Sequence, residues 1–191
     1  MTSAQSTKTL PAEPILLELV DEDGRTIGVA EKLSAHQAPG HLHRAFSVFL
    51  FDTDGRLLLQ QRAHSKYHSP GVWSNTCCGH PYPDEPPQVA AGRRVREELG
   101  LEEVSLQAAG TVTYEHPDEI SGLVEKEYNH LFVGVVDEKP EPDPAEVCDF
   151  RFVNRAELEE LRKREPFSAW FPSVLTAAMP GMARVAPGGG W

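Results

Sequence analysis

The chain is poor in cysteine, and the cysteines it has do not suit a disulfide framework. Only three occur among 191 residues: Cys77 and Cys78 are adjacent, and Cys148 lies far away in sequence. Disulfide-rich domains carry more cysteines, and adjacent cysteines rarely form a bridge. The scarcity excludes a disulfide-built secreted domain and predicts reduced thiols, as in a cytoplasmic protein.

Basic residues and long hydrophobic runs are also scarce. Lys and Arg number 18 against 29 Asp and Glu, which gives a formal net charge of −11. A nucleic-acid-binding protein needs a basic face, so this balance argues against one, although a local basic cluster can still hold a small anion. No apolar run approaches the roughly 20 residues that cross a bilayer. We therefore expect neither a nucleic-acid partner nor a membrane partner, and we expect a monomer.

The length and the remaining composition suit one globular domain. With 191 residues, 40% of them apolar and 25% charged, the chain can bury a single sizeable core. Residues 1–12 are polar and lack the apolar core of a signal peptide, so we expect a disordered leader there. Residues 181–191 include three consecutive glycines and are expected to form a flexible tail. The domain itself is predicted over residues 13–180.

Turn residues divide the chain into short strands and a few helices. Asp-Gly pairs flanked by apolar runs are strong hairpin signals, and Asp54-Gly55 is one of them. The clearest helix runs from Pro86 to Leu99, with Asp84 as a candidate N-cap and Gly100 after its end. Strands are predicted at 15–20, 26–31, 45–51, 57–61, 106–114, 128–136 and 148–153, and closing helices at 155–164 and 167–179. This order predicts an α+β fold, with a mixed sheet in an α/β/α layered domain.

The segment Asn75-Thr76-Cys77-Cys78-Gly79-His80-Pro81 places a thiol two residues before a histidine. Side chains alternate along a strand, so Cys78 and His80 would point to the same face. A cysteine that close to a possible metal ligand could do acid–base chemistry. The alternative is a buried thiol beside a structural histidine, since free cysteine is among the most buried residue types. The segment alone does not decide between the two.

The predicted helix and its approach carry a second motif, Gly79-x5-Glu85-x7-Arg93-Arg94-Val95-Arg96-Glu97-Glu98-Leu99-Gly100-Leu101. Arg94 and Glu98 lie four residues apart and share a helix face, which could be simply a solvated, salt-bridged surface. The spacing, however, resembles the Nudix box, G-x5-E-x7-R-E-U-x-E-E-x-G-U, in which U is aliphatic. Arg94 is the one departure, because it stands where the box has a metal-binding glutamate. It removes a ligand and adds a donor for anions, which disfavours ordinary pyrophosphate hydrolysis.

Further motifs follow in order over roughly residues 14–175. They are Ala30-Glu31-Lys32, His36, His43-x-Ala45-Phe46-Ser47, Arg62-Ala63-x-Ser65-Lys66, Pro70-Gly71-Val72-Trp73-x-Asn75, Cys78-Gly79-His80-Pro81 and Glu125-x-Glu127. Together they resemble the type I isopentenyl-diphosphate isomerase family, a branch of the Nudix-like fold. The resemblance implies a Nudix-like mixed-sheet domain that interconverts isopentenyl and dimethylallyl diphosphate in isoprenoid biosynthesis.

Three histidines and two glutamates of these motifs form a candidate metal site: His36, His43, His80, Glu125 and Glu127. Three imidazoles and two carboxylates leave a sixth position open around an octahedral divalent ion. Mn²⁺ or Mg²⁺ would suit the set, and Zn²⁺ would bind it too. His41 competes with His43 on the same strand face, and the family pattern selects His43. The resemblance also gives Glu98 a Mg²⁺, shared with the substrate diphosphate and the backbone carbonyl of Cys78.

The resemblance implies substrate-binding roles for five further residues. Four cations match positions that bind the diphosphate, since Arg holds phosphate bidentately and Lys acts as a point charge; they are Lys32, Arg62, Lys66 and Arg94. Each could instead be an ordinary surface charge. Trp170 could place its ring against a developing cation, or it could be a core aromatic on the closing helix.

The resemblance also implies the residues that move protons. Cys78 and Glu127 match a pair that acts on opposite faces of the substrate, and Tyr114 could share the proton of Glu127. Two other functions stay open beside the isomerase. A Nudix-type hydrolase of a nucleoside or other diphosphate is disfavoured by Arg94 and by the thiol. A non-catalytic metal-binding module gives no reason for a thiol–carboxylate pair.

Overall fold

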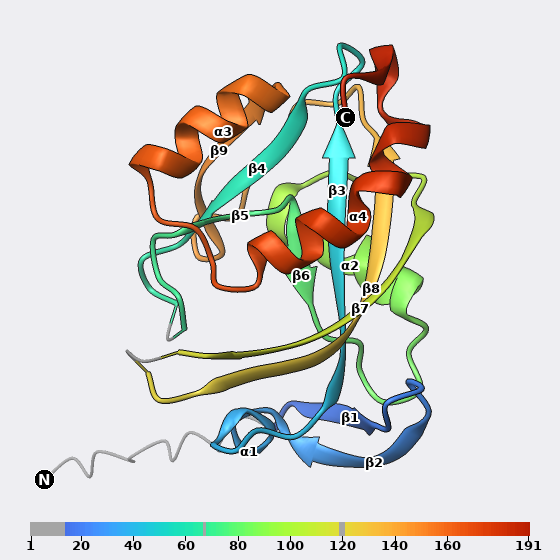
Figure 1. Cartoon of the computed structure of the whole chain (residues 1–191), viewed down its shortest axis with the longest axis vertical. Coiled ribbons are helices and arrows are strands. Elements are labelled where there is room, and N and C mark those ends of the chain that lie inside the picture. Colours follow the sequence, from blue (N-terminus) through green and yellow to red (C-terminus); the bar gives the residue numbers. More distant parts are fainter. Residues whose placement is uncertain (1–13, 67, 119–120) are drawn as a thin grey trace, which may run out of the picture.

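The computed structural model describes residues 14–66, 68–118 and 121–191, and the expected leader at 1–12 lies outside them. One nine-stranded mixed sheet organises this part of the chain (Figure 1). Its strands are β1 (Leu16–Val20), β2 (Thr26–Glu31), β3 (His43–Phe51), β4 (Leu57–Arg62), β5 (Trp73–Ser74), β6 (Cys77–Gly79), β7 (Gln107–Pro117), β8 (Val124–Val135) and β9 (Val147–Val153). The helices are α1 (Lys32–His36), α2 (Pro87–Leu99), α3 (Arg155–Arg164), α4 (Phe171–Val185) and the short 3-10 helix η1 (Pro187–Gly189). Within the described ranges, no helix is long and apolar enough to cross a membrane.

The long strand β3 holds the sheet together. It pairs antiparallel with β1, β4 and β6, and it pairs parallel with β8 from His43–Glu127 to Phe51–Val135. β7 forms an antiparallel ribbon with β8, and β9 is added beside β4. These pairings place the start of β3 next to the first half of β8, so that His43 lies directly beside Glu127.

The two faces of β3 bury different halves of the core. Phe46 and Val48 belong to the apolar cluster under α2, whereas Phe49 and Phe51 belong to the cluster under α4. Both faces of the strand are apolar, so helices must cover the sheet on each side. Figure 1 shows α4 in front of β3 and α2 behind it. The predicted α+β architecture, with helices on both sides of a mixed sheet, is confirmed.

Most predicted elements are present, with bounds that differ by a few residues. β8 begins at Val124 rather than at 128, and α4 begins at Phe171 rather than at 167. Helix α1 escaped prediction because a helix of five residues is too short to show a periodic pattern. Asp84 does not cap α2: Pro86 occupies the N-cap position, and no side chain caps the helix there.

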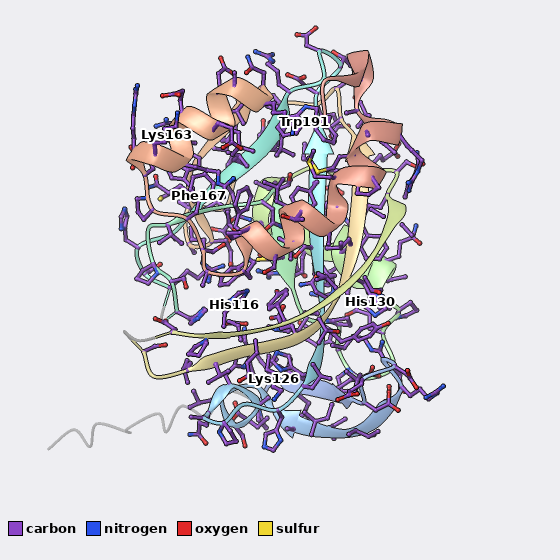
Figure 2. All side chains as sticks on the ribbon, in the orientation of Figure 1. His116, Lys126, His130, Lys163, Phe167 and Trp191 are labelled. Carbon is purple, nitrogen blue, oxygen red and sulfur yellow. The ribbon has the colours of Figure 1, made fainter. Side chains whose placement is uncertain are left out.

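The sequence predicts a flexible tail at 181–191, whereas the structure shows this segment packed against the domain. α4 continues to Val185, past the expected end at 179. Trp191 is 8% exposed, its Nε1 donates to the carbonyl oxygen of Gly55 at 2.7 Å, and its ring centroid lies 5.5 Å from that of Phe51. Figure 2 shows Trp191 beside the end of β3. The glycines suggested disorder, but the aromatic residue that follows them anchors the chain end.

Candidate active site

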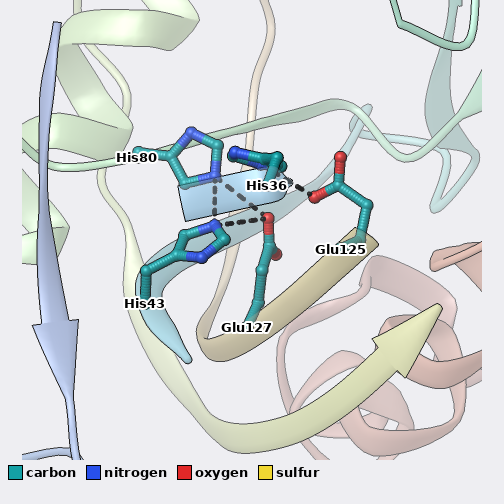
Figure 3. A group of neighbouring side chains, drawn as sticks. All are labelled: His36, His43, His80, Glu125 and Glu127. Carbon is teal, nitrogen blue, oxygen red and sulfur yellow. Dashed lines mark hydrogen bonds and ion pairs between the residues drawn. The ribbon is translucent and has the colours of Figure 1, made fainter. Parts of the chain in front are cut away.

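Strand pairing brings the five candidate metal ligands together from four parts of the chain. His43 opens β3 directly beside Glu127 of β8, and Glu125 lies two residues earlier on the same face of β8. His36 ends α1, and His80 follows β6. Their ligand atoms all lie within 4.8 Å of one another (Figure 3). We call these five residues the buried cluster.

Two imidazoles of the buried cluster are oriented by hydrogen bonds to the backbone. His36 Nδ1 donates to the carbonyl oxygen of Lys32 at 2.7 Å, and His43 Nδ1 donates to that of His41 at 2.8 Å. A carbonyl can only accept, so the hydrogen sits on Nδ1 and the lone pair of Nε2 is left for a ligand bond. His43 therefore faces the cluster, and the exposed His41 supplies only its carbonyl.

The spacing of the ligand atoms fits a shared cation. His43 Nε2 lies 3.2 Å from His80 Nε2, which lies 3.0 Å from Glu127 Oε1. Atoms bound about 2.1 Å from one ion sit roughly 3 Å apart when they are adjacent. His36 Nε2 lies 3.4 Å from Glu125 Oε2. Three imidazoles and two carboxylates gathered in a largely buried site need a positive centre, so the residues fit a divalent metal ion.

Burial separates the pKa values of the buried cluster. It lowers the pKa of His43 to about 4 and that of His80 to about 3, so both imidazoles are neutral, the form that binds metal. Burial opposes charge at His36 too, but the hydrogen bond and charge of Glu125 raise its pKa. Burial raises the pKa of Glu125 to about 7. Burial would raise that of Glu127 as well, but the hydrogen bond from His80 holds it well below its usual range.

The two adjacent cysteines point in different directions. Cys77 is fully buried in the core cluster under α2, whereas Cys78 faces the other side and lines a cavity of about 230 Å³. Burial raises the pKa of the Cys78 thiol to about 12. His80 and Glu127 line the same cavity, as the alternation from Cys78 to His80 predicts. Cys78, which the sequence predicts to be the reactive thiol, therefore has access to the cavity, whereas Cys77 does not line it.

Tyr114 reaches the site through Glu127. The two residues face each other across the β7–β8 ladder, and the Tyr114 hydroxyl donates to Glu127 Oε2. Burial and the neighbouring carboxylate raise the pKa of Tyr114 well above its usual range, so the phenol keeps its proton. Glu127 thus turns Oε1 toward His80 and Oε2 toward Tyr114.

The four candidate diphosphate-binding cations line the same cavity, and we call them the cation rim: Lys32, Arg62, Lys66 and Arg94. Arg62 donates to the carbonyl oxygens of His68 and Ser69 at 3.0 and 3.1 Å. Its guanidinium carbon lies 5.5 Å from the ring centroid of Trp170, which also lines the cavity. All the substrate-binding positions expected from the sequence are therefore brought together around one space.

Glu98 lies in this cavity but outside the buried cluster. Arg94 donates to its Oε1, and Gln60 Nε2 donates to its Oε2 at 2.8 Å. Arg94 Nη1 also lies 2.9 Å from Glu97 Oε2. Arg94, the one residue that departs from the Nudix box, therefore forms ion pairs with both Glu97 and Glu98 of the box. The expected Mg²⁺ at Glu98 stays a prediction.

Asn129 is a site residue that sequence reasoning missed. Its Nδ2 donates to Glu127 Oε2 at 3.0 Å and to the Tyr114 hydroxyl oxygen at 3.1 Å. Because the tyrosine oxygen accepts from Asn129, its own hydrogen is directed to Glu127. The period of two in Glu125-x-Glu127-x-Asn129 places all three side chains on one face of β8, and this signal could have identified Asn129.

His68 is the second residue that was missed. Its ring stacks on Trp170, with centroids 5.7 Å apart and planes 15° from parallel. Its Nε2 lies 3.2 Å from Glu125 Oε1, so it contacts the oxygen of Glu125 that does not face His36. No periodic signal marks His68, because it lies in the loop between β4 and β5.

Known proteins are similar to this chain in sequence. The family model of the NUDIX domain matches residues 41–172. An isopentenyl-diphosphate Delta-isomerase from Streptomyces griseus is 63% identical over 191 residues, covering 100% of this chain and 97% of that protein. Another, from Streptomyces coelicolor, is 65% identical over 181 residues, covering 95% of this chain and 92% of that protein.

Solved structures resemble this one at low sequence identity. The protein DR0079 from Deinococcus radiodurans superposes with a TM-score of 0.68 at 17% identity, over 86% of this chain and 98% of its own. A MutT protein from Methanosarcina mazei Go1 gives a TM-score of 0.58 at 21% identity, over 73% of this chain and 94% of its own. At these identities the likeness concerns the fold alone, and it confirms the predicted Nudix-like fold class.

Proposed function

We propose a mechanism on the premise that this chain belongs to the isopentenyl-diphosphate Delta-isomerase family and contains a Nudix domain. The chain is an isomerase that interconverts isopentenyl diphosphate and dimethylallyl diphosphate. One observation carries the residue assignments: a single cavity is lined by Cys78, Glu127 and the cation rim. The diphosphate is held by the cations, while the isoprenoid chain lies between the thiol and the carboxylate.

The reaction adds one proton to the terminal alkene carbon, C4, and removes another from C2. Protonation of C4 leaves a tertiary cation at C3, and loss of the C2 proton places the double bond between C2 and C3. An unactivated alkene is a very weak base, so the acid has to act in a site shielded from water. We assign protonation of C4 to the Glu127–Tyr114 side and deprotonation of C2 to Cys78.

The protonation states of the free protein set the starting point of the cycle. Cys78 is a thiol at neutral pH, because burial raises its pKa to about 12, and Glu127 is ionised because His80 lowers its pKa. These are the states reached once Cys78 has taken a proton from C2 and Glu127 has given one to C4. The reverse reaction starts from them directly. A new forward turnover needs Cys78 to lose a proton to solvent and Glu127 to take one up from solvent.

We propose that the buried cluster holds one Mn²⁺, Mg²⁺ or Zn²⁺ ion, and that Glu98 holds Mg²⁺ together with the substrate diphosphate. A bound divalent ion makes a coordinated carboxyl group a stronger acid. The two carboxylate oxygens of Glu127 have different partners: Oε1 faces His80, while Oε2 accepts hydrogen bonds from Tyr114 and Asn129. The second oxygen is thus the one through which Tyr114 can deliver or withdraw a proton.

Trp170 and the cation rim complete the proposed roles. The indole ring, which lies beside Arg62, stabilises the positive charge that develops at C3. Arg62 and Arg94 bind phosphate oxygens through paired N–H groups, and Lys32 and Lys66 add point charges. The diphosphate is thereby anchored while the reaction takes place at carbon.

A direct assay tests this function against hydrolysis. The purified protein is incubated with isopentenyl diphosphate and Mg²⁺, and products are identified by NMR. Formation of dimethylallyl diphosphate is expected. Released phosphate would instead indicate a hydrolase, and bound metal without turnover would indicate a non-catalytic module. Arg94 argues against hydrolysis, because it stands where the Nudix box has a metal-binding glutamate.

A further inference from the structure

One carboxylate already lies among the cations that we assign to the substrate. Glu146 Oε2 forms an ion pair with Lys66 Nζ and lies 3.1 Å from Arg94 Nη2. All three residues line the cavity. Both cations converge on a single oxygen atom, which is also how they would bind an oxygen of a phosphate group.

The backbone holds Glu146 in this place. Its amide donates to the carbonyl oxygen of Asp143 at 2.9 Å, and its carbonyl accepts from the amide of Ala63 at 2.9 Å. Ala63 directly follows Arg62, so Glu146 is tied to the end of β4. One quarter of its side chain is exposed. The backbone of Glu146 is therefore a fixed part of the cavity wall, while its side chain can change partners.

The cation rim needs negative charge when no substrate is present. Burial lowers the pKa of Lys66, and the nearby positive charges of Arg62 and Arg94 lower it further. Arg94 Nη2 contacts two carboxylates at once, from Glu98 and Glu146. These carboxylates offset the repulsion among cations that face one space.

We propose that Glu146 is an internal competitor of the diphosphate, whose carboxylate occupies a phosphate-oxygen position between Lys66 and Arg94 until substrate displaces it. This inference rests on the function proposed above. An entering diphosphate meets a like charge and has to share or replace two ion pairs, so it binds less tightly than the four cations alone would allow. The same competition helps the product to leave, because Glu146 re-forms its ion pairs as the diphosphate departs.

Pyrophosphate is the probe that isolates this competition, because it carries the diphosphate without the isoprenoid chain. It is titrated calorimetrically into wild type, Glu146→Gln and Glu146→Ala, each with and without Mg²⁺. Both variants are expected to bind it about tenfold more tightly, the value of one charge-assisted hydrogen bond. Glu97→Gln is the matched control, since Glu97 also pairs with Arg94 but does not line the cavity. It should change the affinity less than twofold.

The kinetics of the Glu146→Gln variant give a second readout. Its KM for isopentenyl diphosphate should fall, while kcat should not rise, because product release is slowed. Unchanged affinity for pyrophosphate would overturn the inference, and so would weaker binding, which would instead make Glu146 a Mg²⁺ ligand or a support for the cations. The activity of the wild type separates the two proposals. If the wild type forms no dimethylallyl diphosphate, the proposed function fails. If the wild type is active but the variant binds pyrophosphate with unchanged affinity, only the proposed role of Glu146 is contradicted.

Discussion

The buried cluster and the cation rim share one cavity but are held in different ways. His43, Glu125 and Glu127 of the cluster are set by the register of β3 and β8, and their side chains are buried. The cations are half-buried, and Lys66 and Arg94 are held by ion pairs with carboxylates. Backbone pairing thus fixes the groups that we propose for proton transfer. Ion pairs hold the groups that we propose exchange partners when a diphosphate binds.

The strongest test of this division removes one charge from the buried cluster. Glu127→Gln keeps the shape of the side chain but removes the proposed carboxylate ligand, which is also the proposed acid. We expect kcat to fall by about 10⁴-fold, the upper end for acid–base catalysis, and bound metal to fall as well. Steady-state kinetics and elemental analysis measure the two effects. Glu115→Gln, on the exposed side of β7, is the control and should change neither.

The two adjacent thiols test whether position alone decides reactivity. Cys78→Ala should lower kcat by about 10³-fold and leave metal content and melting temperature near wild type, because only the base is lost. Cys77→Ala should remain active, since Cys77 packs in the core under α2. A dead Cys77→Ala beside an active Cys78→Ala would show that the assignment is off by one residue.

The cation rim should respond differently from the buried cluster. Arg62→Ala is expected to raise KM for isopentenyl diphosphate about 10- to 100-fold, the value of a charge-assisted interaction, with kcat within a few-fold of wild type. Arg56→Ala, in the exposed hairpin turn, is the control. If Arg62→Ala lowered kcat at unchanged KM, the rim would take part in the chemistry and the division would break down.

The sequence predicts the residues of the buried cluster more completely than it predicts the contacts around that cluster. Period-two spacing and the family motifs place Glu125, Glu127 and His43, because strand geometry carries such patterns directly. Glu146 and His68 are reached only through the fold, since both lie in loops and meet their partners across long sequence separations. Trp191 likewise packs through partners far away in sequence, Phe51 and Gly55, which the glycine-rich tail sequence alone does not indicate.

The smallest expected effect is a pH dependence within the buried cluster. Burial lowers the pKa of His43 from its usual 6.5 to about 4, so the unfolded chain binds the extra proton first as pH falls. The contribution of His43 to the free energy of unfolding is therefore full above about pH 6.5 and is lost toward pH 4, by roughly 2 kcal/mol between pH 7 and pH 5. Urea unfolding of the metal-free protein measures this. His43→Asn should show a weaker dependence on pH, and an equal dependence would contradict the assignment.

Proton transfer at carbon is the central claim, and isotope incorporation tests it most directly. Wild-type protein is incubated with isopentenyl diphosphate and Mg²⁺ in D₂O, and the product is analysed by NMR and mass spectrometry. Because the acid on the Glu127–Tyr114 side exchanges with solvent, the mechanism predicts dimethylallyl diphosphate with deuterium in a methyl group and with its diphosphate intact. Release of phosphate with the double bond unmoved would contradict it.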